Sequence, residues 1–598
     1  MRSAIGATIA LVLLLALAPG AAAKDPPAVH LVVLPSGTTV AELADAGFSP
    51  GLMSAGLGTV PPEQTYLDIT QGNRVFDSLY DEDLREYEGS RAAWWRAVRE
   101  RAESAPADIV PGLLSATLRQ AGVPRFVEFR RTYLSRLDSA GRDLTIAFAD
   151  PTGESDAPLP IGIAGPGFDG NLTSDSTRMD GYVLSTDVAP TILDHFGIPI
   201  PAEMSGQPIR SEGSIDAAAI DSLGARMAVI SSRRGPVVGL NIVIWLAALA
   251  LVALLSRGRL ARPGVRVTGL SIVFLPLVLL LGAALEPGEA VERLLVLLLT
   301  PALAALTLLL LRGYRALAVA SALTVIVYAI DVIAGSPLTS LSLLGPNPGL
   351  GVRFYGIGNE LEALLAVLVL GGTGAGLVAF APRASGRASA WAFLGFGLLA
   401  AIVFAAGRFG ADVGAAIVFP VGAAVAAATI AGRGRRPLAL ALIAAPLAVL
   451  ALLALVDLLS GANAHLTRSV LDAGGLGDLA DVAQRRLQLS AHSFARPVLL
   501  AFLPVVAAVA VLAYLRRDRL RAWLAQVPAM RAGLAGALAA TAVGTLANDS
   551  GALLLEIGTA YLLVFTGFAW AESDPNRENA AQQTKSYNFV CHTYDSIP

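Results

Sequence analysis

The residues of this chain best suited to chemistry are charged and amide side chains that interrupt its most hydrophobic half. They lie in three motifs, GPNPGLGVRFYGIGNE at 345–360, GRFGAD at 407–412 and ANDSG at 547–551. Ionisable groups in such apolar surroundings are costly and are retained mainly where a function needs them. An arginine next to carboxylates suits a phosphate or pyrophosphate headgroup, because the guanidinium group binds such oxygens in pairs. The candidate substrate-binding residues are Arg353, Asn359, Glu360, Arg408, Asp412, Asn548 and Asp549.

Further carboxylates accompany these motifs and leave several roles open. Glu362 follows the first motif, while Asp331 and Asp457 lie near the ends of other apolar stretches. The carboxylates could orient the arginines, bind a cation or act as a base. In the structural alternative, Arg408 and Asp412 form an ion pair and Asn548–Gly551 is a turn that caps a helix. We favour one shared site, because the same residue types recur at three separate junctions.

The elements that must position these residues are membrane-spanning helices. The hydrophobic fraction is 54%, the charged fraction 15% and the mean hydropathy +0.61, which are typical of a membrane protein. Alternate loops are rich in arginine, which predicts that they are cytoplasmic and that the three motifs face outward. We expect about eleven spans, near 237–256, 267–285, 294–311, 315–334, 360–380, 390–406, 412–431, 437–457, 498–515, 530–547 and 551–570.

The domain organisation follows from the remaining segments. Residues 1–23 resemble a signal peptide, and 24–234 alternate short β-rich runs with helical patterns. This alternation predicts an extracytoplasmic α/β domain with a largely parallel sheet. An all-α polytopic transmembrane domain of about eleven helices at 235–570 and a disordered cytoplasmic tail at 571–598 complete the chain.

Charge and cysteine content exclude several function classes. A net charge of −3, without a basic stripe, gives no reason to expect a nucleic-acid partner. The single cysteine, Cys591, excludes an intrachain disulfide and a thiolate metal cluster. We predict no metal site and no cofactor, although the carboxylates of the membrane motifs would also suit a divalent cation.

One segment resembles a known family. Residues 181–209, GYVLSTDVAPTILDHFGIPIPAEMSGQPI, contain Thr-Asp-Val-Ala-Pro-Thr-Ile-Leu, then Gly-Ile-Pro, then Gly206. This pattern is similar to the C-terminal signature of the alkaline phosphatase superfamily, which includes phosphodiesterases, sulfatases and membrane phosphoethanolamine transferases. We expect Thr186 or Asp187 to cap a helix whose first turn admits Pro190 and which ends at Gly197.

The catalytic parts that the resemblance implies are largely missing. Family members place a metal-binding Asp after the first strand, and this chain has Pro35 and Ser36 there. The Asp-His-Gly motif of the family does not occur in the sequence, and a structural role is expected for His195. A pair of divalent ions needs several such ligands, so the resemblance implies a reduced, non-catalytic pseudoenzyme. Ser36, Thr38 and Asp68 are the residual candidates if the domain is active.

Two functions are compatible with this layout. In the first, a phosphatase-like domain accompanies a membrane domain of the bacterial cell envelope that binds or moves a lipid-linked or anionic substrate. In the second, the protein is a transferase or hydrolase of phosphoryl-type groups on envelope lipids or glycans. Membrane lipids are the expected partners in both. An amphipathic helix at 479–496 is expected on the outer leaflet, either as a lid or as a surface connector.

Overall fold

The structure is a computed structural model that describes residues 28–84, 90–123, 128–137, 143–153, 156–432, 444–452, 490–491, 493–494 and 497–573. The chain divides into two compact units, Met1–Ser222 and Leu223–Pro598. The expected signal peptide, almost all of the expected helix at 479–496 and residues 574–598 of the expected tail lie outside the described residues.

The first unit is built on a mixed β-sheet in the strand order β3-β1-β4-β5-β2-β7, beside a two-stranded sheet β6-β8. We expected a largely parallel sheet, but β5 runs antiparallel to both β4 and β2. Residues 150–158, which join β4 to β5, are too few for the crossover that a parallel pair requires. The strands are β1 (Val29–Leu34), β2 (Ser49–Ser54), β3 (Glu128–Arg131), β4 (Leu144–Ala149), β5 (Leu159–Ala164), β6 (Asn171–Ser174), β7 (Tyr182–Leu184) and β8 (Ile209–Glu212).

Helices cover both faces of this sheet. Leu31 and Val33 of β1 belong to a core that also contains residues of α3 (Pro62–Gln71), α5 (Leu113–Gln120) and α6 (Val188–His195). Val32 and Leu34 point to the opposite face, where α2 (Val40–Asp45) packs, because successive strand residues alternate between faces. The expected α/β class is therefore confirmed, with α4 at Arg91–Glu103 and α7 at Ala217–Arg233.

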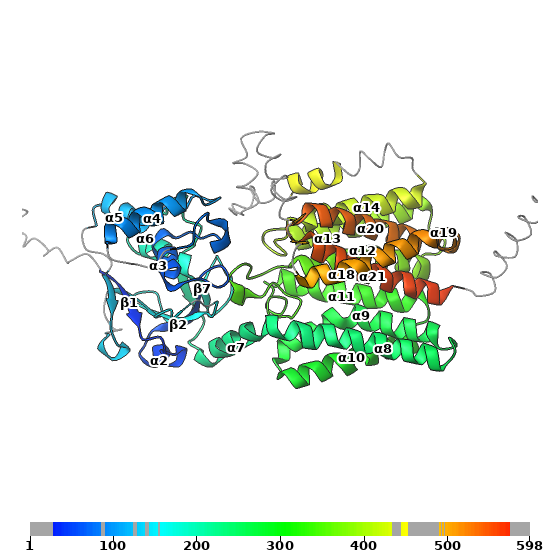
Figure 1. Ribbon diagram of the computed structural model, residues 1–598, viewed down its shortest axis with the longest axis horizontal. Coiled ribbons are helices and arrows are strands. Elements are labelled where there is room, and N and C mark those ends of the chain that lie inside the picture. The colour runs from blue at the N-terminus through cyan, green and yellow to red at the C-terminus, as the bar shows by residue number, and fades with distance from the viewer. Residues whose placement is uncertain are drawn as a thin grey trace, which may run out of the picture. The chain divides into compact units, whose positions relative to one another are not determined.

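The second unit is a bundle of apolar helices (Figure 1). Among the described residues, eight helices are long and apolar enough to cross a membrane, and Ala415–Ala431 and Phe502–Leu515 are shorter apolar helices. Residues 444–452 are the only described part of the span expected at 437–457. The helices are α8 (Leu240–Leu255), α9 (Ala261–Leu285), α10 (Glu289–Leu310), α11 (Tyr314–Ile333), α12 (Asn359–Phe380), α13 (Gly386–Ala405), α14 (Ala415–Ala431), α18 (Pro497–Leu515), α19 (Arg517–Leu524), α20 (Pro528–Ala547) and α21 (Gly551–Glu572).

The entry into the bundle is helical throughout. We expected the first domain to end at residue 234, and one continuous helix runs from Ala217 to Leu255 across this point. A π-helical turn, Arg234–Gly239, lies within it and joins α7 to α8. Turns of this kind widen a helix locally and occur frequently at functional sites.

Glycines bring α12, α14 and α20 into close contact. A Cβ at Gly533 would lie 2.6 Å from the Leu370 carbonyl oxygen, and a Cβ at Gly536 would lie 2.5 Å from that of Gly422. A Cβ at Gly374 would lie 2.9 Å from the Ala529 carbonyl oxygen. Small residues let helix backbones approach in this way inside membranes. This packing fixes the ends of the three helices relative to one another.

The segment between α11 and α12 is irregular, as its prolines and glycines predict. It is described in full, and its single helical turn is the 3₁₀ turn Pro348–Leu350. Several of its polar groups are paired inside the unit: the Asp331 carboxylate accepts from the amides of Leu338 and Thr339, and the Ser340 hydroxyl donates to the Phe354 carbonyl. Irregular backbone at membrane depth requires such internal pairing or a watery cavity.

Candidate functional site

The N-terminus of α12 is the point at which the three polar motifs meet. Asn359 donates a 2.9 Å hydrogen bond to Asp549, which lies in the connection between α20 and α21. Glu362, one turn into α12, accepts from the side-chain amide of Asn548 in the same connection. The first and third motifs are thus joined by two side-chain contacts across roughly 190 residues of sequence. We call the residues Arg353, Asn359, Glu360, Glu362, Asp412, Asn548 and Asp549 the α12 cluster.

The second motif enters the α12 cluster through backbone and side-chain contacts. The amide of Ile357 donates to the Gly410 carbonyl at 3.0 Å. The Asp412 carboxylate accepts from the Gly414 amide at 3.0 Å and lies 3.8 Å from the Arg353 guanidinium group. Arg353 also donates to the carbonyl oxygen of Ile357. Arg353 is therefore held by groups from both motifs.

Gly414 brings the Glu362 carboxylate against the second motif. A Cβ at Gly414 would lie 2.4 Å from the Asn548 side-chain nitrogen and 2.7 Å and 2.8 Å from the two Glu362 oxygens. Only glycine leaves space for the carboxylate and the amide beside the start of α14. Glu362 and Asp412 are buried, at 0% and 2% exposure, so the cluster places two acids in the interior of the unit.

Glu360 takes a partner that the sequence motifs did not predict. Arg234, in the π-helical turn, lies 3.0 Å from the Glu360 carboxylate and donates to the Gly345 carbonyl at 2.7 Å. Nearby, Arg226 and Arg233 each lie 2.9 Å from Glu292. The arginines of the α7 region are functional candidates that no sequence motif revealed, because their partners lie far along the chain.

Arg408 differs from the other candidates. Its side chain is exposed, whereas Asp412, four residues later, is buried. Arg353 is an ion partner of Asp412, at 3.8 Å. The turn expected at Asn548–Gly551 does precede α21, and the Asn548 amide group bonds to Glu362. Asp457 lies outside the described residues.

The three residual catalytic candidates of the first unit have separate surroundings. Ser36 is exposed, and the Thr38 hydroxyl donates to the Pro35 carbonyl at 2.8 Å. Asp68 is buried and accepts from Gln64 at 2.7 Å and from Gln71 at 3.1 Å. Burial raises the pKa of Asp68 to about 7, although the neighbouring Arg74 and Arg101 oppose this shift. Asp68 therefore belongs to a buried polar network of α3 rather than to the turn that carries Thr38.

An open groove lies at the end of β1 in the first unit. It has a volume of about 590 Å³ and is lined in part by Pro35, Gly37, Thr38, Glu42 and Tyr133. Ligands of open α/β sheets bind outside the carboxyl ends of the strands, and this groove has that position. Among the described residues, no group of three or more His, Cys, Asp or Glu side chains could hold a metal ion.

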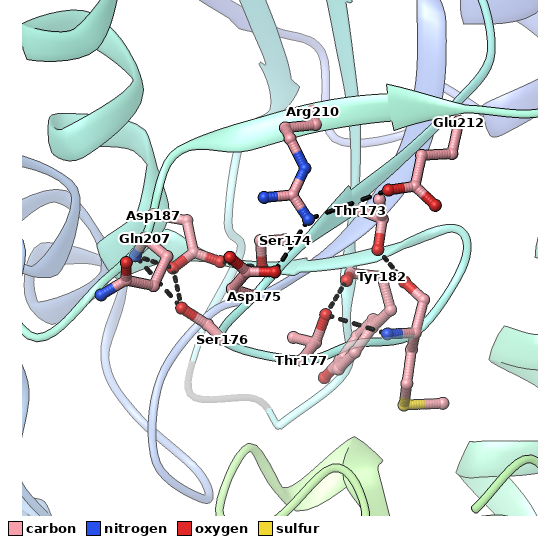
Figure 2. A network of polar contacts seen from close by, with 11 residues as sticks. Thr173, Ser174, Asp175, Ser176, Thr177, Tyr182, Asp187, Gln207, Arg210 and Glu212 are labelled. Atoms are coloured by element: carbon pink, nitrogen blue, oxygen red, sulfur yellow. Dashed lines mark hydrogen bonds and ion pairs between the residues drawn. The ribbon is translucent and has the colours of Figure 1, made fainter. Parts of the chain in front are cut away.

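The signature segment of the first unit is a packing element built on Asp187 (Figure 2). Its buried carboxylate accepts from the hydroxyls of Ser174 and Ser176 at 2.7 Å and 2.6 Å. It also accepts from the backbone amides of Leu184 and Gln207, both at 2.9 Å. Burial raises the pKa of Asp187, with these four hydrogen bonds acting in the opposite direction. Asp187 thus joins two loops to the end of β7.

The details of the expected capping differ from the sequence prediction. The helix α6 begins at Val188, admits Pro190 in its first turn and is followed by Gly197 with φ of +66°. The Asp187 side chain makes no capping bond to α6, because its oxygens are used by the four donors described above. A Cβ at Gly206 would lie 2.1 Å from the Thr186 carbonyl oxygen, so this position requires glycine. His195 is half-buried beside Phe196, and burial lowers its pKa.

Comparison with known proteins does not assign this chain to a family. No family model, curated protein or solved structure matches this chain. The multi-pass membrane character follows from the apolar helices of the second unit.

Proposed function

We propose that this chain is an eleven-span protein of the bacterial plasma membrane that binds or moves a lipid-linked or anionic substrate at the outer leaflet. The observation that carries the proposal is the meeting of three distant polar motifs at the N-terminus of α12. A structural ion pair needs two residues, whereas this cluster collects groups from three helix connections. Intramembrane ionisable residues of this kind mark substrate and ion pathways.

The arginines supply the anion-binding chemistry of the proposal. The side chains of Arg353 and Arg234 are each 34% exposed, and Arg408 is exposed. Each can offer part of its guanidinium group to phosphate oxygens, while Asp412 and Glu360 hold the first two in position. A planar guanidinium group binds phosphate through paired hydrogen bonds. A phosphate or pyrophosphate headgroup fits this arrangement best.

The orientation and the role of the first domain are parts of the same proposal. The signal-like start and the arginine-rich alternate loops support an extracytoplasmic first domain and an outward-facing α12 cluster. The first domain is a reduced, phosphatase-like pseudoenzyme with a structural or substrate-presenting role. In support of this, the Thr38 hydroxyl bonds to the turn, and Pro35 follows the first strand where the family has a metal-binding Asp.

The experiment compares ligands that co-purify with matched arginine variants. Native mass spectrometry and lipid extraction of the full chain in mild detergent should find a bound phosphate-bearing lipid or anion. The double variant Arg353→Gln/Arg408→Gln should retain about tenfold less, which corresponds to the loss of about 1.4 kcal/mol in binding. The control, Arg383→Gln/Arg387→Gln, removes two exposed arginines, one in the connection between α12 and α13 and one at the start of α13. Equal retention by both variants would contradict the proposal.

A second candidate function rests on the groove at the end of β1. Its position and the hydroxyls of Ser36 and Thr38 favour a transferase or hydrolase acting on phosphoryl-type groups of envelope lipids or glycans. Such chemistry would need divalent metal ions, and the described residues around this turn offer no group of three His, Cys, Asp or Glu side chains to hold them. Stoichiometric zinc or manganese in the purified full chain, with turnover of a phosphodiester that Ser36→Ala or Thr38→Ala abolishes, would select this alternative.

A further inference from the structure

Two buried glutamates of the second unit have opposite surroundings. Glu292 is 1% exposed and lies 2.9 Å from each of two guanidinium groups, those of Arg226 and Arg233. Glu362 is fully buried, and its partner is the neutral amide of Asn548. Its second oxygen, Oε1, has no hydrogen-bond partner among the residues that the structure describes. Burying a carboxylate is expensive unless its charge is paired, so Glu362 in its ionised form lacks the compensation that Glu292 has.

The neighbourhood of Glu362 increases this imbalance. The charged groups that act on its carboxylate are Asp412, Arg353 and Asp549, two acids and one base. The base, Arg353, is already paired with Asp412 at 3.8 Å. Asp549 is exposed and bonds to Asn359. Glu362 therefore shares its surroundings with two further acids, while its own partner is the neutral amide of Asn548.

Two other helices packed against α12 present described polar groups that are acids or have partners of their own. The Asp331 carboxylate, at the end of α11, is bonded to backbone amides. On α21, Tyr561 donates to the Ile272 carbonyl, and Glu556 is a further acid. A proton on Glu362 would neutralise its buried carboxylate, and it needs less room than the Cβ that Gly414 excludes.

We infer that the pair Glu362 and Asp412 binds one proton. The proton resides on the buried oxygen Oε1 of Glu362. Protonation converts Glu362 into a neutral acid and leaves Asp412 paired with Arg353. Release of the proton would place two like charges together and favour movement of the second motif away from α12. For its use the inference rests on the proposed function, because the proton would then be coupled to substrate binding at the α12 cluster.

The test is carbodiimide labelling of the full chain in detergent, without added substrate. Dicyclohexylcarbodiimide reacts with protonated carboxyl groups in apolar surroundings, and peptide mass spectrometry locates the product. At neutral pH Glu362 should be labelled at least about tenfold faster than Glu292, because Glu292 lies 2.9 Å from two guanidinium groups whereas the partner of Glu362 is a neutral amide. Labelling of Glu362 should fall as the pH rises, and sodium ions at constant pH should have no effect.

The variant Asp412→Asn tests the shared proton. Removing the like charge should move the pH midpoint of Glu362 labelling downward by about one unit, a tenfold change in proton affinity. Absence of Glu362 labelling at every pH, an unchanged midpoint in Asp412→Asn, or protection by sodium would each overturn the inference. Because labelling is read in the wild type without substrate, it can succeed while the ligand-retention experiment fails, and the reverse also holds.

Discussion

Replacement of Gly356 by alanine should destabilise the second unit through one specific backbone contact. Gly356 lies in the segment before α12 with φ of +79°, and a Cβ there would lie 2.0 Å from the Gly410 carbonyl oxygen. The Gly410 carbonyl accepts from the Ile357 amide, so it cannot move without breaking the connection between the first and second motifs. The atoms that a Cβ would meet belong to the Gly410 backbone, so no flexible side chain can move to relieve the overlap.

The expected loss in the free energy of unfolding of Gly356→Ala has two parts. An alanine in the left-handed region costs about 1–2 kcal/mol. Overlap with a rigid neighbour costs about 1–3 kcal/mol more. Gly356→Ala should therefore lower the free energy of unfolding by about 2–5 kcal/mol. Gly335→Ala is the matched control, because Gly335 has φ of +104° in the same segment and a Cβ there would meet no atom within 4 Å. Gly335→Ala should lose only the backbone cost of about 1–2 kcal/mol.

The assay is reversible unfolding of both variants in mixed micelles, followed by the loss of helical circular dichroism. The difference between the two variants measures the contact with Gly410 and should be about 1–3 kcal/mol. Equal destabilisation would refute the conclusion that the first and second motifs are fixed against each other. Greater loss in Gly335→Ala would refute it more strongly.

Two further predictions concern the first unit. Asp187→Ala leaves the buried amide of Leu184 without this acceptor and the amide of Gln207 with only the Ser176 hydroxyl, and it should cost about 1–3 kcal/mol in thermal unfolding. The control Asp175→Ala, which removes an exposed 2.8 Å pair with Arg210, should cost about 1 kcal/mol or less, and a similar loss in both would contradict the packing role of Asp187. Burial raises the folded-state pKa of Asp68 to about 7, above its unfolded value, so the contribution of Asp68 to stability should be fully present below about pH 4 and should be lost as the pH rises to 7. Amide hydrogen exchange of α3, corrected for intrinsic rates, should show this loss of protection in the wild type but not in Asp68→Asn, and a pH-independent wild type would show that the Asp68 pKa is not raised.

Local features of the fold could be predicted from the sequence because they depend on neighbouring residues. The strand at 145–149 and the helix at 91–103 have clear hydrophobic patterns, and the prolines and glycines of 345–358 predict an irregular segment. The antiparallel direction of β5 was not predicted. The hydrophobic pattern of a sequence shows where a strand lies but not in which direction it runs relative to its neighbours. Its short connection to β4 is the signal that could have revealed it.

Pairing within the site could be predicted only in outline. The recurrence of polar motifs at three junctions correctly suggested that Asn548, Asp549 and Asn359 lie close together. The partners of individual charges depend on tertiary contacts: Glu360 binds Arg234, which is 126 residues away, and Asp412 lies 3.8 Å from Arg353 in another motif. Glu362 received little weight from the sequence, yet the structure places it at the centre of the cluster.

The central claim is that the α12 cluster opens to the outer face of the membrane. Single cysteines at Val352, which is 49% exposed, and at the exposed Arg383 test it in a Cys591→Ser background. An impermeant thiol reagent applied to intact cells should label Val352→Cys, and it should label Arg383→Cys only after the membrane is permeabilised. Labelling of Arg383→Cys in intact cells, with Val352→Cys protected until permeabilisation, would contradict the account.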